Sequence, residues 1–293
     1  MRLLNATLTY DQALLGLRWR WYGKNIDHKR GVWEMSYDQS VAEVFLHLAN
    51  KHPELLRHLP PSSTEFSDFE KELGFRGSFH YQKDLRCELA SLCDKYGSDK
   101  GEIKSAGHPY PWPSHSYSDY YRRLWGHCRN SVTKVFECGL GTNNPNLTSS
   151  MGISGKPGAS LRVWRDYFPK AFVYGADIDK DILFSEDRIK TFYIDQTNPE
   201  AIAQFWSAVD EMDFDFMVDD GLHVFDHGAC LFMHSIERLA PFGIYVIEDV
   251  QQNDLRKYKE FFKTTNYLVD FVSLYRPNLA LGDNNLVVVR KNY

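Results

Sequence analysis

Short apolar runs alternate with amphipathic segments along the second half of the chain. Five runs have strand length and composition, and they cover residues 132–141, 171–179, 189–197, 213–221 and 243–250. The intervening segments 160–168, 199–209 and 224–240 carry apolar residues at helical spacing. Strands that alternate with helices predict right-handed crossovers and a mostly parallel sheet with helices on both faces.

The end of the chain breaks this alternation. A helical pattern over 255–265 is followed by two strand patterns, 268–276 and 283–291, with no room for a helix between them. We therefore expect an antiparallel pair of strands at one edge of the sheet. A doubly wound sheet with this finish is typical of class I S-adenosylmethionine-dependent methyltransferases, whereas dinucleotide-binding sheets usually stay parallel. The predicted fold is α/β, with a doubly wound, seven-stranded, mostly parallel sheet.

The first third of the chain has a different character. Helical spacing predicts helices over 38–58, 66–75 and 82–95, and residues 96–117 then become rich in Gly, Pro, Ser, His and aromatic residues. A loop of this length often covers a binding site. We expect a mainly helical region over 1–95 and a methyltransferase domain over 96–293. Several aromatic residues near the start fit an interface between copies of the chain as well as a second core: Trp19, Trp21, Tyr22 and Trp33.

Composition narrows the class of protein. The chain has 293 residues, of which 43% are hydrophobic, and a net charge of −5 without a basic, aromatic-rich block, which argues against nucleic acid as a partner. The five cysteines are odd in number and include no CxxC pair, which favours reduced thiols. The sequence shows no membrane-length apolar run and no signal-peptide pattern. We expect a cytoplasmic chain with no membrane partner.

Residues at the ends of the predicted strands suggest a nucleoside cofactor. Gly139 and Gly141 form a GxG turn, but the third glycine of the dinucleotide fingerprint is absent, which favours S-adenosylmethionine over NAD. Asp177 ends the next strand, where an acid can accept both ribose hydroxyls. It lies farther from Gly139 than the roughly 20 residues of a compact unit, because a loop is inserted over 143–159. That loop either shapes the substrate pocket or is a plain surface loop.

The third strand ends in Asp195 and Gln196. A carboxylate and an amide at this place can bind an adenine edge. A turn built on the sequence DQTNP is the alternative.

Acidic residues end the fourth and fifth strands. Asp219 and Asp220 follow the fourth strand, and Glu248 and Asp249 follow the fifth. Because neighbouring strands lie about 5 Å apart, we expect Asp220, Glu248 and Asp249 to converge. Crowded carboxylates repel one another unless a cation holds them, and oxygen ligands suit Mg²⁺ or another hard divalent cation. Capping of the following helices is the alternative for Asp219 and Asp249 taken singly.

A histidine follows the first acidic pair closely. His223 is the candidate general base, because a hydroxyl coordinated to a cation has a lowered pKa and an imidazole can take its proton. His227 gives an HxxxH spacing that also occurs in zinc sites. No glutamate follows His223 in the metallohydrolase pattern, so we interpret His227 as a residue of the helix surface.

Together these motifs carry a family resemblance. FECGLGT, GASLRVWRDYFPKAFVYGADID, DRIKTFYIDQTNP, FDFMVDDGLH and GIYVIEDV, preceded by YGSDKG and HSYSDYYRRL, resemble the metal-dependent sugar O-methyltransferases of macrolide and bacterial polysaccharide pathways. The resemblance covers about residues 92–249. It implies Asp220, Glu248 and Asp249 as metal ligands and His223 as the base. The cofactor positions that it implies are Glu137, Gly139, Gly141, Asp177, Asp195 and Gln196. It leaves Lys100 of YGSDKG open between an ion pair and a contact with the cofactor carboxylate.

The combined prediction is a metal-dependent O-methyltransferase. It would move a methyl group from S-adenosylmethionine to a hydroxyl of a sugar, glycan or related small-molecule acceptor. Two alternatives stay open: a metal-dependent hydroxylase or hydrolase that uses the same carboxylates, and a non-catalytic nucleotide-binding scaffold protein.

Overall fold

The computed structural model describes residues 33–37, 77–81, 87–101, 109–110, 112–274 and 282–292. Contacts divide the chain into two compact units. The first unit comprises residues 1–85 with 272–281, and the second comprises 86–271 with 282–293.

Little of the first unit lies within the described residues. Its described residues before residue 85 form two strands, β1 (Trp33–Tyr37) and β2 (Gly77–Tyr81), which pair antiparallel. The sequence did not predict these strands. The helices expected over 38–58 and 66–75, and the aromatic residues at 19–22, lie outside the described residues.

A mixed sheet forms the centre of the second unit. Its strands follow the order β9-β10-β8-β7-β3-β4-β6-β5. Strands β8, β7, β3, β4 and β6 run parallel, whereas β10 is antiparallel to β8 and β5 to β6. The bounds are β3 Lys134–Cys138, β4 Phe172–Asp177, β5 Ser185–Glu186, β6 Ile189–Tyr193, β7 Phe214–Asp219, β8 Leu239–Ile247, β9 Tyr267–Leu274 and β10 Asn285–Lys291.

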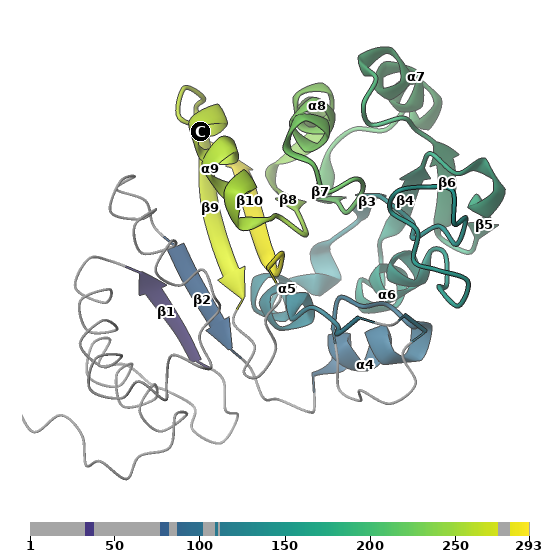
Figure 1. Cartoon of the computed structure of the whole chain (residues 1–293), viewed down its shortest axis with the longest axis horizontal. Coiled ribbons are helices and arrows are strands. Elements are labelled where there is room, and N and C mark those ends of the chain that lie inside the picture. The colour runs from purple at the N-terminus through teal and green to yellow at the C-terminus, as the bar shows by residue number, and fades with distance from the viewer. Residues whose placement is uncertain are drawn as a thin grey trace, which may run out of the picture. The chain divides into compact units, whose positions relative to one another are not determined.

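Helices cover both faces of this sheet (Figure 1). Those of one face pack on each other and are α4 (Glu88–Tyr96), α5 (Tyr117–Trp125) and α6 (Ala159–Tyr167). Those of the other face are α7 (Pro199–Val209), α8 (Phe225–Ser235) and α9 (Gln252–Phe262). Short 3-10 turns lie at Arg129–Ser131, Lys180–Ile182 and Ile236–Arg238. The doubly wound, mostly parallel α/β fold predicted from the sequence is therefore confirmed.

Local sequence explains why these elements form where they do. Asn198 caps α7 by accepting from the N–H groups of residues 200 and 201, and Pro199 occupies the first turn, where its missing N–H costs nothing. The central strands are apolar on both sides, so aromatic rings fill the space under each layer of helices. Phe216 contacts Tyr121 and Trp164 on one face, both with ring centroids at 5.3 Å.

Two elements of the second unit were not predicted. Helix α5 begins at Tyr117, at the end of the segment interpreted as a loop, and its buried residues include Tyr121 and Trp125. The two-residue strand β5 is too short to leave a pattern in the sequence. Of the predicted loop over 96–117, residues 102–108 and 111 lie outside the described residues.

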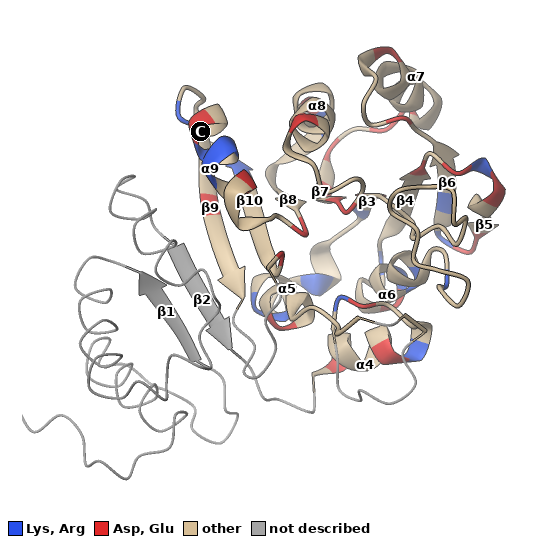
Figure 2. Ribbon diagram, in the orientation of Figure 1, with Lys and Arg blue, Asp and Glu red and all other residues tan. Residues whose placement is uncertain are grey.

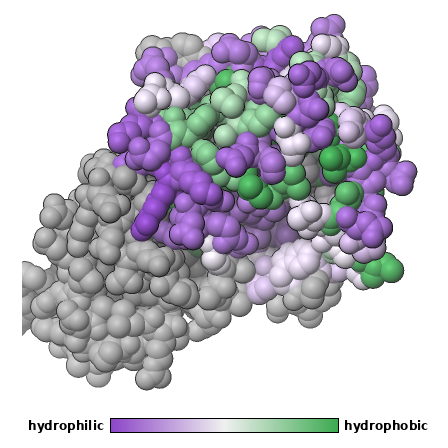
Figure 3. Space-filling model, turned by 45° about the horizontal axis from the view of Figure 1, so that its top comes forward, coloured by the Kyte–Doolittle hydropathy of each residue, from purple (hydrophilic) through white to green (hydrophobic). Residues whose placement is uncertain are grey.

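Charged and apolar residues are distributed as in an ordinary globular unit. Figure 2 shows acidic and basic residues interspersed, with acidic residues where the chain leaves β7 and β8. On the face drawn in Figure 3, hydrophilic residues surround a smaller group of hydrophobic ones. No helix among the residues that the structure describes combines the length and the apolar character needed to cross a membrane. All five cysteines are free thiols, as the sequence predicted.

Candidate active site

The candidate site lies where the order of the strands reverses. Chain connections run from β3 outward to β4 and β6, and then return to β7 and β8 on the other side of β3. In open α/β sheets, ligands bind at such a point, beyond the carboxyl ends of the strands. Glu137 and Gly139 lie at the end of β3, Asp219 ends β7, and Glu248 follows β8. The fold thus brings the predicted strand-end residues to one edge.

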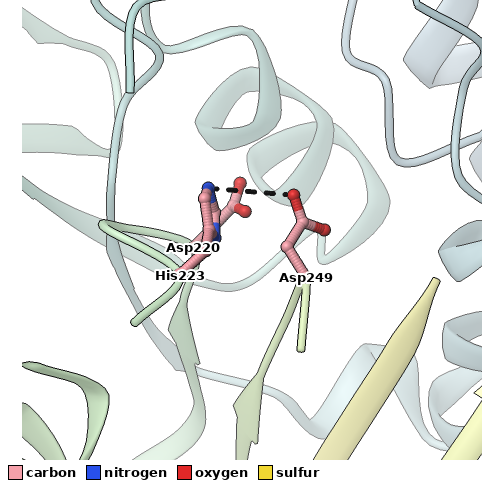
Figure 4. Close-up of side chains that lie close together, drawn as sticks. All are labelled: Asp220, His223 and Asp249. Atoms are coloured by element: carbon pink, nitrogen blue, oxygen red, sulfur yellow. Dashed lines mark ion pairs between the residues drawn. The ribbon is translucent and has the colours of Figure 1, made fainter. Parts of the chain in front are cut away.

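Asp220, His223 and Asp249 point toward one another at this edge (Figure 4). One donor atom from each lies within 4.8 Å of the others. Nε2 of His223 lies 3.8 Å from Oδ2 of Asp249, and all three side chains keep partial exposure to solvent. His223 and Asp249 both adopt left-handed backbone conformations, with φ of 54° and 53°. Such strain in residues other than glycine gathers at functional sites.

These three residues fit a divalent cation. Donors around an ion at about 2.1 to 2.4 Å lie at most about 4.2 to 4.8 Å apart, and the three donor atoms lie within 4.8 Å of one another. The two carboxylates suit Mg²⁺, Mn²⁺ or a similar hard ion, and His223 lies beside them. We call Asp220, His223 and Asp249 the outer cluster.

Glu248 faces a different direction. Its side chain is fully buried, and its two oxygens bind Lys100 Nζ and the Tyr121 hydroxyl. The chain leaves the extended path of β8 here, because Asp249 has a left-handed backbone, and this separates its side chain from that of Glu248. The structure therefore brings Asp220 together with Asp249 and His223, and it places Glu248 with Lys100.

Lys100 joins Glu248 to two further carboxylates. Its ammonium nitrogen lies 2.6 Å from Asp220 Oδ2 and 3.2 Å from Glu137 Oε1, and its side chain is 3% exposed. We call Lys100, Glu137 and Glu248 the inner group. Of the two roles left open for Lys100, the structure shows the ion pair. Burial would lower the pKa of Lys100, but the facing carboxylates outweigh it and raise the pKa well above its usual value.

Glu137 lies at the back of the inner group. It is completely buried, and its Oε2 accepts a hydrogen bond from the indole nitrogen of Trp164 on α6. Burial raises the pKa of Glu137, although Lys100 opposes that effect. Burial likewise raises the pKa of Glu248. The lysine thus carries the compensating charge that lets two glutamates occupy a dry site.

Tyr117 and His115 hold the other acid of the outer cluster. The Tyr117 hydroxyl donates to Asp249 Oδ1 at 2.6 Å, and the rings of His115 and Tyr117 stack with their centroids 4.7 Å apart. Nε2 of His115 lies 3.5 Å from Asp249 and 3.4 Å from Asp283. Burial would lower the pKa of His115, but these carboxylates raise it to about 10, so the ring is cationic at neutral pH.

The glycine turn after β3 packs against the loop that carries Asp220. Gly139 has φ of 93°, and a Cβ there would lie 2.0 Å from the carbonyl oxygen of Asp220. Gly141 is also left-handed, with φ of 76°. Asp177 supports this turn, because its Oδ2 accepts from the Leu140 N–H at 2.7 Å and its Oδ1 from the Asp179 N–H. Burial raises the pKa of Asp177.

Gln196 and Asp195 have different surroundings. Gln196 is buried between the loops, where it donates to Asp219 Oδ1 at 3.2 Å and accepts from the Leu222 N–H at 2.9 Å. Gly221 makes room for it, since a Cβ there would lie 1.8 Å from the amide oxygen. Asp195 accepts from the N–H and hydroxyl of Thr197, the turn contact named as its alternative.

Asp219 and Asp179 serve structural roles near the site. Asp219 points inward to Gln196, and burial raises its pKa to about 6. Asp179 caps the 3-10 turn that begins at Lys180 by accepting from the Asp181 N–H. In each acidic pair, DD and ED, one residue thus joins the outer cluster while its neighbour is buried in contacts with the protein.

Sequence reasoning missed three residues that touch the acids: His115, Tyr117 and Tyr121. Tyr117 and Tyr121 lie four residues apart, which places them on the same face of a helix, and both are buried. That spacing within HSYSDYYRRL was visible in the sequence. Because the segment was interpreted as the end of a loop, the helical face was not recognised.

Comparison with known proteins relates the chain to sugar methyltransferases. No protein-family model matches it. Over 163 residues it is 31% identical to the 8-demethyl-8-alpha-L-rhamnosyl tetracenomycin-C 2'-O-methyltransferase of Streptomyces olivaceus. This match covers 56% of this chain and 38% of that protein. Over 160 residues it is 31% identical to the demethylmacrocin O-methyltransferase of Streptomyces fradiae. This match covers 54% of this chain and 38% of that protein. The chain spans less than two-fifths of the length of these curated relatives.

The comparison with solved structures also found a methyltransferase. The MycE methyltransferase from the mycinamycin biosynthetic pathway, in complex with Mg and SAH, is 23% identical, with a TM-score of 0.49. The match covers 70% of this chain and 54% of that one. At the level of sequence, the chain is related over about half its length to sugar O-methyltransferases of the macrolide and tetracenomycin type.

Proposed function

We propose that this protein is an S-adenosylmethionine-dependent O-methyltransferase that methylates a hydroxyl of a sugar-like acceptor with the help of a divalent cation. The observation that carries the proposal is the outer cluster, in which two carboxylates and an imidazole from neighbouring strands share one partly exposed space. The relatives at 31% identity are named as O-methyltransferases, one of them acting on a rhamnosyl tetracenomycin, which supports the same reaction class.

The residues beside the glycine turn would hold the cofactor. The glycines at 139 and 141 carry no side chain, so a ligand can approach the backbone of the turn closely. We assign the cofactor side to Glu137, Gly139, Gly141 and Asp177, with Asp195 and Gln196 on the adenine side. S-adenosylmethionine would supply the methyl group.

Asp220 and Asp249 would hold the divalent ion, and His223 would act beside them. A bound ion would lower the pKa of a coordinated acceptor hydroxyl. His223 presents Nε2 toward the same space, where it can take that proton. Its Nδ1 is buried without a hydrogen-bond partner among the described residues, so the ring is held by packing. Glu248 stays a proposed member of the site, with the described structure favouring a role through Lys100.

Fixed geometry is the main contribution that these residues can make. The three acting groups come from the loops that directly follow β7 and β8, and the left-handed conformations of His223 and Asp249 aim them into one space. Holding an acceptor and a methyl donor in line can lower the barrier by about 7 to 11 kcal/mol.

A titration followed by a transfer assay tests the proposal. Adenosylhomocysteine should raise the melting temperature of the purified chain, whereas NAD should not. Methyl transfer to a panel of nucleotide sugars and glycosides should require Mg²⁺ or Mn²⁺ and stop on addition of EDTA.

Each alternative has its own outcome in this experiment. Metal-dependent turnover without S-adenosylmethionine would indicate a hydroxylase or hydrolase. Stabilisation by adenosylhomocysteine with no transfer to any acceptor, with or without metal, would favour the scaffold.

A further inference from the structure

Two buried groups each take one oxygen of an outer-cluster carboxylate. The Lys100 ammonium lies 2.6 Å from Asp220 Oδ2, and the Tyr117 hydroxyl lies 2.6 Å from Asp249 Oδ1. The other oxygen of Asp249, Oδ2, is the one that faces His223. In Figure 4 the two carboxylates approach the same space from opposite sides.

Both groups are themselves fixed from behind. Lys100 is held by Glu248 and Glu137 and is almost completely buried. Tyr117 is buried and stacks on His115 with an angle of 5° between the ring planes. Its hydroxyl also accepts from the N–H of Asp249 at 3.1 Å.

We propose that Lys100 and Tyr117 are positioning residues, which lock Asp220 and Asp249 so that each presents its free oxygen to the divalent ion. The inference rests on the proposed metal site and deepens it. It assigns the ion one oxygen from each aspartate and makes Glu248 the counter-ion of Lys100.

Lys100 and Tyr117 would act by preorganising the two carboxylates. A carboxylate with two free oxygens samples several orientations, and binding an ion must stop that motion. A partner bound to one oxygen removes the motion beforehand. Outer partners of metal ligands typically contribute 10-fold to 100-fold in metal affinity. Lys100 also cancels one of the nearby negative charges, so the site gains order at some cost in attraction for the ion.

Tyr117→Phe is the sharpest test, because it removes one hydroxyl and keeps the ring. The dissociation constant for Mn²⁺, measured by electron paramagnetic resonance on the full chain, should rise about 10-fold or more. Activity at saturating Mn²⁺ should recover toward that of the unchanged protein, since only the occupancy of the site is lost. Tyr96→Phe is the matched control, because the Tyr96 hydroxyl also donates to a carboxylate, that of Asp166, on the helix surface.

A charge-balanced double variant tests the lysine. Lys100→Met alone would leave buried carboxylates unpaired and would endanger folding. Lys100→Met combined with Glu248→Gln removes one charge of each sign and should raise the Mn²⁺ dissociation constant about 10-fold or more above that of Glu248→Gln alone. Lys95→Met with Asp166→Asn removes an exposed pair of the same kind, 3.0 Å apart, and should leave Mn²⁺ affinity unchanged.

The outcomes separate the inference from the proposed function. If the unchanged protein binds no Mn²⁺, the metal site itself is wrong and the inference fails with it. If it binds Mn²⁺, Tyr117→Phe binds it equally well and the lysine double variant binds it as well as Glu248→Gln alone, only the positioning role is overturned. A loss of activity that saturating Mn²⁺ does not restore would also overturn the positioning role, because that result would indicate general damage to the fold.

Discussion

Replacing Gly139 by alanine would test the backbone contact between the glycine turn and the Asp220 loop. The residue has φ of 93°, and the added Cβ would lie 2.0 Å from the carbonyl oxygen of Asp220. That oxygen belongs to the backbone and cannot rotate away as a flexible side chain would. The loop that delivers Asp220 to the outer cluster would therefore have to move.

Two terms set the size of the effect. An L-residue in the left-handed region costs about 1 to 2 kcal/mol, and forcing an extra carbon into a packed site costs about 1 to 3 kcal/mol more. Gly139→Ala should thus lower the free energy of unfolding by about 2 to 5 kcal/mol. Gly152 isolates the first term, because it has φ of 74° and nothing within 4 Å of an added Cβ. Gly152→Ala should cost only about 1 to 2 kcal/mol.

Urea denaturation of the two variants and the unchanged protein measures both terms, and Mn²⁺ titration reports on the outer cluster. Gly139→Ala should also weaken Mn²⁺ binding, whereas Gly152→Ala should not. Equal losses of stability in the two variants would refute the contact as the cause. Unchanged Mn²⁺ affinity in a folded Gly139→Ala protein would show that the Asp220 loop does not depend on the turn.

Two further predictions address the base and the surface ion pairs. His223→Ala should reduce methyl transfer about 10² to 10⁴-fold, while the binding of adenosylhomocysteine, measured by calorimetry, persists. Retained turnover would remove His223 from the mechanism. A loss of Mn²⁺ affinity alone would make His223 a metal ligand. Burial would raise the pKa of Asp166, but hydrogen bonds from Tyr96, Lys95 and Arg165 outweigh it and lower the pKa to about 2. Because the pKa of Asp166 is lower in the folded chain, its ionised carboxylate stabilises the fold above the unfolded value of about 3.9. This stabilisation is lost as the pH falls toward 2. After allowance for the partial exposure of the side chain, this effect should change the free energy of unfolding by about 1 kcal/mol, and it should be absent in Asp166→Asn. Identical urea midpoints for the two proteins at pH 5 and again at pH 2.5 would contradict this expectation.

The fold and the edge that carries the site could be predicted from local sequence. Alternating patterns fix which segments are strands and helices, and parallel crossovers then bring all carboxyl ends to one side. This is why residues as distant as Gly139, Asp220 and Asp249 were placed together correctly. Helix α5 escaped prediction because Pro, Ser and His dominate the segment just before it, and residues 109–117 read as a loop.

Only the tertiary structure decided how the acids divide. Neighbouring residues such as Glu248 and Asp249 look alike in sequence, yet the left-handed backbone of Asp249 separates their side chains. Which one reaches the outer cluster depends on what packs behind it. That is set by Lys100, which lies 148 residues from Glu248 along the chain. A buried lysine has to meet carboxylates wherever the fold places them, because an unpaired charge in a dry interior is too costly to keep.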